Sequence, residues 1–127
     1  MRIWLSIIII VALLQSSTAP RKGGNPDAAK TANPVARSAE STSAGKRVYT
    51  RMCSRCHGAE GKGDGTAASA PVPDLTDDTW DYGGSDGEIF AVIHDGVSTD
   101  MDGYAARLSD TDIWNVVNFV RSVAAKR

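Results

Sequence analysis

Cys53-Ser54-Arg55-Cys56-His57 is the stretch of this 127-residue sequence from which both fold and chemistry can be predicted. A Cys-x-x-Cys-His pattern is typical of covalent attachment of a c-type haem. Two intervening residues let both thiols reach neighbouring vinyl groups on one porphyrin edge and form thioether bonds. The imidazole of His57 would then lie beneath the ring and hold the iron from one side. The motif therefore predicts one covalent haem c, bonded by Cys53 and Cys56.

The cysteine count limits the alternatives, because the chain has only two cysteines and both lie in the motif. A disulfide between them would close a very small loop and stabilise little. A thioredoxin-like redox pair would need a βαβ pattern around the motif, which the sequence lacks. A zinc site would need His94 and an acidic residue at an unusual spacing. Haem attachment is therefore favoured over each of these sites.

Residues 1–19 have the pattern of an export segment. Arg2 provides a positive start, Ile3 to Leu14 form an almost unbroken apolar run, and Ser17-Thr18-Ala19 provides small residues for cleavage. Pro20 directly after this site disfavours cleavage, so the segment is either a signal peptide or an uncleaved N-terminal anchor. We expect a periplasmic protein, soluble or tethered to the inner membrane, which agrees with covalent haem attachment outside the cytoplasm.

Residues 20–44 are predicted to be a disordered linker. The segment is rich in Ala, Ser, Thr, Pro, Asn and Lys, and it has no aromatic residue. Such a composition buries too little apolar surface to offset the entropy lost on ordering. Pro26 and Pro34 also argue against a helix through this region. The chain would then begin its folded domain at Gly45.

Residues 45–127 are predicted to form a single helical domain. Val48, Tyr49 and Met52 share one helical face, which indicates a first helix from about Gly45 into the motif. Glycines interrupt regular structure after His57. A domain this small is marginal on its own core, so a covalent porphyrin would supply apolar surface for the helices to pack against.

Three later helices are predicted from capping patterns. Ser85 and Glu88 form a capping box for a helix that Gly96 can end. Ser109 and Asp112 open the last helix, which has valines and isoleucine at helical spacing. Thr76 or Asp77 would cap a short helix with Trp80. No convincing strand is present, so we expect an all-α fold of about four or five helices around one haem.

Three stretches of the domain match one known family. They are Gly45 and Tyr49 followed by Cys53-Ser54-Arg55-Cys56-His57-Gly58, then residues 96–101, and then Leu108-Ser109-Asp110 with Ile113-Trp114 and Phe119-Val120-Arg121-Ser122. On these stretches the sequence resembles the class I c-type cytochromes, small bacterial mono-haem proteins. The resemblance implies that the first and last helices cross at near right angles. It also implies that Gly45 and Tyr49 meet Phe119 at this crossing.

The resemblance further implies a methionine as the second axial ligand of the iron. Met101 is the methionine placed before the last helix, whereas Met52 next to the motif is better explained as a core residue. The family usually has a proline after this methionine, and this chain has Asp102. Without the fixed φ of a proline, the loop would be less stiff and the bond from Met101 to iron more labile.

Further residues are candidates for contacts around the haem. The family's hydrogen bond from the ligating histidine to a proline carbonyl implies Pro73, with Pro71 as the alternative. Trp80, Tyr82 and Arg107 are candidates for propionate contacts, although packing or surface roles suit each equally well. His94 competes with Met101 as a ligand, but a position near a helix C-terminus favours a surface or capping role.

The resemblance implies a periplasmic electron carrier rather than an enzyme. A His57/Met101-ligated iron would pass single electrons between redox protein partners, and no nucleic-acid partner is expected. Two alternatives stay open: a haem subunit bound permanently to a larger dehydrogenase or oxidase, and a protein that binds a gas or peroxide where Met101 is labile. Basic residues cluster around the motif and acidic residues between Asp74 and Glu88. The basic cluster suggests docking onto acidic partners.

Overall fold

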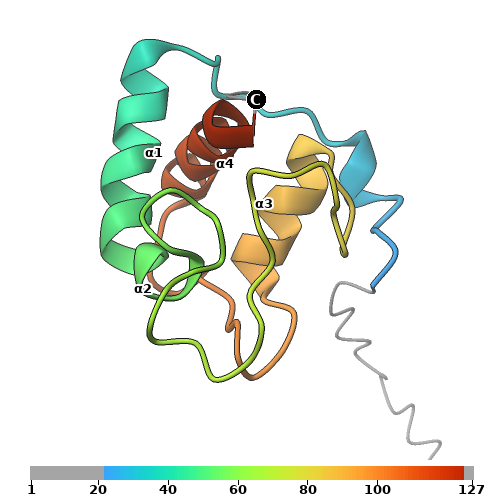
Figure 1. Ribbon diagram of the computed structural model, residues 1–127. Coiled ribbons are helices and arrows are strands. Elements are labelled where there is room, and N and C mark those ends of the chain that lie inside the picture. Colours follow the sequence, from blue (N-terminus) through green and yellow to red (C-terminus); the bar gives the residue numbers. More distant parts are fainter. Residues whose placement is uncertain (1–21, 125–127) are drawn as a thin grey trace, which may run out of the picture.

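The computed structural model describes residues 22–124, which form a helical domain (Figure 1). Its elements are η1 (Ala28–Lys30), α1 (Ala39–Met52), α2 (Ser54–His57), α3 (Asp86–Asp95) and α4 (Asp110–Ala124). Within these residues the only β pairing is an isolated bridge between Gly96 and Asp102. The predicted all-α fold is thus confirmed, while the predicted export segment, residues 1–19, lies outside the described residues.

Helices α1 and α4 pack against each other at a glycine (Figure 1). A Cβ atom on Gly45 would lie 1.9 Å from the carbonyl oxygen of Asn115 and 3.0 Å from the Cβ of Phe119. Any larger residue would therefore push the helices apart. Beside this contact, the rings of Tyr49 and Phe119 lie 4.8 Å apart between centroids. The expected meeting of Gly45 and Tyr49 with Phe119 is confirmed.

The helix ends show which capping patterns formed. The predicted boxes at Ser85 and Ser109 both form, because each hydroxyl accepts the N–H of the acidic residue three positions on. Gly96 ends α3 with a φ of 77°, a conformation that favours glycine. The predicted helix with Trp80 is wrong: Asp77 accepts the N–H of Thr79, and the segment forms turns.

Helix α1 begins at Ala39, earlier than the predicted start near Gly45. Ser38 and Ser41 cap each other reciprocally: the Ser38 hydroxyl accepts the N–H of Ser41 at 3.1 Å, and the Ser41 hydroxyl accepts the N–H of Ser38 at 3.2 Å. This box uses a serine in place of the usual Glu or Gln. The linker composition concealed it from sequence analysis.

The N-terminal segment, residues 22–38, also differs from the expected disordered linker, because it packs against α3 and α4 (Figure 1). The amide of buried Asn118 donates to the carbonyls of Val35 and Ala36 at 3.1 and 3.4 Å and to the hydroxyl of Ser41 at 3.0 Å. Its side-chain oxygen accepts from the amide of Asn33 at 3.0 Å. The hydrogen bonds of Asn118 thereby hold the segment in place although the segment buries little apolar surface.

A second anchor of the N-terminal segment lies at the start of α3. The backbone N–H of Asn25 donates to the carboxylate of Glu88 at 2.9 Å. A Cβ atom on Gly87 would lie 1.9 Å from the carbonyl oxygen of Ala28, so the segment passes in direct contact with α3. Hydrogen bonds from Ser85 and Asn25 lower the pKa of Glu88, which keeps the carboxylate ionised.

We predict that Asn118→Ala lowers the free energy of unfolding by about 2–3 kcal/mol, because several hydrogen-bonding groups lose their partner at a buried site. Urea unfolding of the haem-loaded protein measures this difference. The control is Asn115→Ala on the same helix, whose side chain makes no hydrogen bond among residues 22–124. Both substitutions change helix propensity equally. Equal losses in the two variants would show that the N-terminal segment adds nothing to stability.

Candidate haem site

The motif forms a short turn of helix directly after α1. The N–H groups of Cys56 and His57 donate to the carbonyl of Cys53 at 3.2 and 2.9 Å. Residues three and four positions apart lie on one side of such a turn, so both cysteines and the histidine face the same space. Both cysteines are half-buried and unbridged. The predicted thioether and ligand residues are therefore brought together.

The imidazole of His57 is mostly buried, and its Nδ1 atom has no hydrogen-bond partner among the described residues. Burial lowers the pKa of His57 and favours the neutral imidazole, the form that can bind a metal. Pro73 is exposed and its carbonyl does not accept a hydrogen bond from Nδ1, so the expected contact is not formed in this structure. A buried, unpartnered imidazole on the Cys-x-x-Cys turn fits a haem ligand.

Other properties of the site also fit an apolar cofactor. Burial raises the pKa of the Cys53 thiol to about 12, so the thiol is protonated at neutral pH. Met52, Leu75, Phe90 and Met101 pack against the core but remain partly exposed. A porphyrin would cover apolar surface of this kind.

The chain after the motif folds back onto it. The N–H of Ala67 donates to the carbonyl of Arg55 at 3.0 Å, and the N–H of Leu75 donates to the carbonyl of Gly61 at 2.7 Å. A Cβ atom on Gly65 would lie 2.4 Å from the carbonyl oxygens of Arg55 and Cys56. Close backbone packing therefore fixes one wall of the site.

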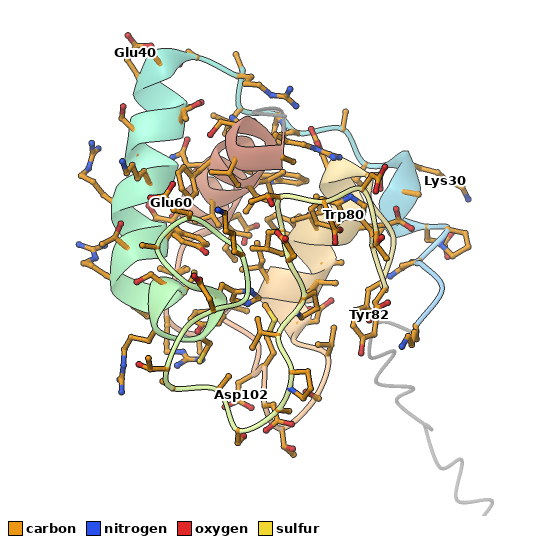
Figure 2. All side chains as sticks on the ribbon, viewed as in Figure 1. Lys30, Glu40, Glu60, Trp80, Tyr82 and Asp102 are labelled. Carbon is orange, nitrogen blue, oxygen red and sulfur yellow. The ribbon has the colours of Figure 1, made fainter. Side chains whose placement is uncertain are left out.

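Met101 lies in the loop between α3 and α4, residues 96–109, here termed the Met101 loop. The N–H of Val97 donates to the carbonyl of Met101 at 3.0 Å, and the N–H of Met101 donates to the hydroxyl of Ser98 at 3.3 Å. Its side chain is half-buried against the core that α3 and α4 share. Asp102, in the position where the resembled family has proline, is exposed at the outer edge of the loop (Figure 2).

His94 is held by neighbouring carboxylates and an aromatic ring. Its Nδ1 atom lies 2.6 Å from Asp95, and its Nε2 atom lies 3.7 Å from Asp110. The imidazole stacks on Phe90 with a centroid distance of 5.3 Å. One nitrogen therefore faces a carboxylate at the end of α3 and the other a carboxylate at the start of α4.

The three candidates for propionate contacts have different surroundings (Figure 2). Trp80 lies beside α3, with the Arg121 guanidinium 5.9 Å from its ring centroid. Tyr82 is half-buried and points away from the helices. Arg107 is exposed, stacks over Tyr104 and donates to the carbonyl of Gly103 at 3.2 Å. Arg107 thus stabilises the Met101 loop, and no described contact assigns Trp80 or Tyr82 to a haem.

Tyr104 joins the Met101 loop to α1, a role that its sequence position does not predict. Its hydroxyl donates to the carbonyl of Met52 at 3.0 Å, across 52 positions of the sequence. No local pattern marks this residue, because its partner is a backbone carbonyl at the distant end of α1. Only the folded chain brings the Met101 loop and the motif together.

Four cations define a cationic face next to the motif: Lys46, Arg47 and Arg51 on α1, and Arg55 on α2. Arg47 and Arg51 are four residues apart on α1, so they lie on one side of that helix, and Arg55 follows on α2. None of the four forms an ion pair with another residue of the described range 22–124, whereas Lys22, Lys30 and Arg121 each do. This face is therefore available to an anionic partner.

Comparisons with known proteins agree with this geometry. A family model described as "Cytochrome C oxidase, cbb3-type, subunit III" matches residues 40–120. The cbb3-type cytochrome c oxidase subunit CcoP of Rubrivivax gelatinosus is 31% identical over 94 residues, which cover 73% of this chain but only 29% of CcoP. The chain thus spans less than a third of that relative's length.

Two solved structures share the fold. A chain of the Kuenenia stuttgartiensis reducing HAO-like protein complex superposes with a TM-score of 0.65 at 30% identity, covering 71% of this chain and 46% of that one. Cytochrome c6 of the diatom Phaeodactylum tricornutum superposes with a TM-score of 0.54 at 26% identity, covering 65% of this chain and 93% of that one. Among residues 22–124, no helix is both long and apolar enough to cross a membrane.

Proposed function

Because the chain belongs to the family of cytochrome c oxidase, cbb3-type, subunit III, whose members hold covalent haem c, we propose that it is a periplasmic mono-haem electron carrier. Cys53 and Cys56 would form the thioether bonds, and His57 and Met101 would be the axial ligands. When bound, haem c supplies an iron that gains and loses one electron between its ferric and ferrous states. The residues around it would fix the ligands, exclude water and leave one edge accessible.

The observation that supports this function best is the buried, unpartnered imidazole of His57 beside two unbridged cysteines. A buried polar atom without a partner is costly, which supports a rearrangement of the chain around Nδ1 when the site is loaded. In a ligating histidine the second nitrogen orients the ring through a hydrogen bond. In the haem-loaded protein the segment around Pro73 would move toward His57, and the Pro73 carbonyl would accept that hydrogen bond from Nδ1.

Met101 is supported as the distal ligand over His94 by their surroundings. His94 is engaged by Asp95 at the end of α3 and by Asp110 at the start of α4. Met101 lies in the loop that Tyr104 bonds to Met52 beside the motif, and its backbone is held by Val97 and Ser98. Thioether coordination raises the reduction potential and suits electron transfer.

A second candidate function is that of a haem domain that works inside an oxidase. The name of the Rubrivivax gelatinosus relative supports it, since that protein is a subunit of a cbb3-type oxidase. Membrane extraction of the tagged chain separates the two proposals. A carrier is recovered free of other subunits, whereas an oxidase subunit is recovered with its partners in fixed stoichiometry.

We further propose that the cationic face docks an acidic surface of the redox partner. Arg55 lies between the two cysteines that would bond the haem, so a partner bound there would approach the haem edge closely. The net charge of the whole chain is only −1, so attraction of an anionic partner would depend on this local cluster. Such attraction weakens as ionic strength rises.

Stopped-flow oxidation of the ferrous protein by two small one-electron oxidants tests the carrier function and the docking at the cationic face. Ferricyanide, an anion, should oxidise one protein per molecule, and the rate should fall with added salt. Tris(phenanthroline)cobalt(III), a cation, should show no such fall. We expect Arg47→Gln/Arg51→Gln to slow ferricyanide by about two- to fivefold at low salt.

The matched control is Lys30→Gln/Arg37→Gln, which removes the same charge from the N-terminal segment. Its rate with ferricyanide should stay near that of the unmodified protein. Equal slowing in both double variants would contradict docking at the cationic face. Absence of one-electron oxidation by either reagent would contradict the carrier function itself.

A further inference from the structure

Two side-chain hydrogen bonds join the Met101 loop to the part of the chain that contains the haem motif. The hydroxyl of Tyr104 donates to the carbonyl of Met52, directly before Cys53, at 3.0 Å. The hydroxyl of Ser69, in the loop after the motif, donates to the carboxylate of Asp100 at 2.7 Å. Asp100 and Tyr104 lie on either side of Met101. The methionine is therefore bracketed by two contacts that cross from one wall of the site to the other.

The base of the Met101 loop is closed by backbone contacts alone. Gly96 and Asp102 form an isolated antiparallel bridge. A Cβ atom on Gly96 would lie 2.5 Å from the nitrogen of Gly103, so the two ends of residues 96–103 touch. This closure shapes the loop but does not fix it relative to His57. Backbone bonds from Tyr104 and Ala105 to the carbonyls of Ile93 and His94 hold the loop on α3. The two side-chain hydrogen bonds join it directly to the opposite wall, which carries the motif.

On this basis we propose that Tyr104 and Ser69 are positioning residues for the distal ligand: their hydrogen bonds hold the Met101 loop closed over the iron. The inference rests on the proposed ligation by Met101 and adds how that ligand is retained. The inference also explains how the loop can have Asp102 where the resembled family has proline. The two hydrogen bonds across the site would replace the stiffness that a proline gives to the loop.

The contact of Tyr104 also has a simpler structural explanation. The Met52 carbonyl belongs to the last turn of α1, where carbonyls lack helical partners, so a hydroxyl there could act only as a helix cap. A cap would change the stability of the domain without changing how long Met101 stays on the iron. Ser69 offers an independent check, since it is exposed and caps no helix.

Ligand exchange on the haem-loaded ferric protein distinguishes these explanations. Imidazole binds the iron only when Met101 has left, so its rate of binding at saturating concentration reports opening of the loop. We expect Tyr104→Phe and Ser69→Ala each to increase this rate by about three- to tenfold, the effect of one lost hydrogen bond. In the double variant the two factors should multiply, because the contacts lie on different sides of Met101.

Thr66→Ala is the matched control, because Thr66 is exposed in the same loop as Ser69 and makes no hydrogen bond within residues 22–124. Its exchange rate should equal that of the unmodified protein. Lower stability to urea in Tyr104→Phe with unchanged exchange rates in both variants would overturn the positioning role. If the unmodified ferric protein lacks a sulfur-to-iron charge-transfer band, ligation by Met101 fails, and the inference fails with it. If the unmodified protein shows the band but Tyr104→Phe and Ser69→Ala leave the exchange rate unchanged, ligation by Met101 stands and only the positioning role is contradicted.

Discussion

Cys53→Ala/Cys56→Ala should yield a polypeptide without covalent haem when exported in a host that attaches haem c. Covalent attachment needs a sulfur at each vinyl group, and the chain has no other cysteine to supply one. Haem-dependent peroxidase staining of the denatured protein on a gel, where only covalently bound haem is retained, should fall to background. Since the family holds covalent haem c, this is the largest effect that we expect from any substitution.

The same variant should also lose most of its folded structure. Met52, Leu75, Phe90 and Met101 are partly exposed in the polypeptide alone, and haem would bury them. Loss of that burial costs about 25 cal/mol for each Å² of apolar surface. Far-ultraviolet circular dichroism measures the loss of helix.

Ser54→Ala is the control, because Ser54 lies between the two cysteines and, within residues 22–124, its hydroxyl bonds only to the carbonyl of Thr50. It should keep full staining and full helix content. Retained staining in the double cysteine variant would contradict the assignment of the thioether residues. A single substitution, Cys53→Ala or Cys56→Ala, should leave one thioether and an intermediate yield.

Local patterns predicted the helices whose caps lie close in sequence. The boxes at Ser85 and Ser109 each act over three residues, so α3 and α4 could be placed without any tertiary information. The start of α1 was missed although its cap is equally local, because the box at Ser38 has Ser41 in place of the usual Glu or Gln. The N-terminal segment could not be predicted from local patterns. The order of this segment depends on Asn118, whose partner Asn33 is 85 positions away. The composition of this segment predicted disorder. Composition carries no information about one buried amide elsewhere in the chain that bonds several backbone groups of the segment.

The residues of the candidate site also differ in whether local sequence predicts their contacts. Cys53, Cys56 and His57 belong to one turn, so their convergence follows from spacing in the sequence. The expected bond between His57 and Pro73 involves a loop whose path depends on close glycine contacts, and the structure does not form it. Tyr104 is the opposite case: it is a contact that the structure forms and that no local pattern predicts.

Met101→Leu should remove the sulfur-to-iron charge-transfer band from the absorption spectrum of the ferric protein. Leucine keeps an apolar side chain of similar volume but has no thioether to bind the iron. The reduction potential should fall on the order of 0.1–0.3 V, within the range of about 0.8 V over which axial ligands set haem potentials. Optical titration against redox mediators measures the potential, and covalent haem staining should be unchanged because both cysteines remain.

Met52→Leu provides the matched control for the loss of the thioether. Met52 packs against the same core as Met101 and lies directly before the motif, and among residues 22–124 it is the other methionine. If Met52→Leu keeps the charge-transfer band and the potential while Met101→Leu loses both, the distal ligand is Met101. The reverse result would assign Met52, at the end of α1, as the ligand. Absence of the band already from the unmodified ferric protein would point to His94, whose release from Asp95 and Asp110 would then have to accompany haem binding.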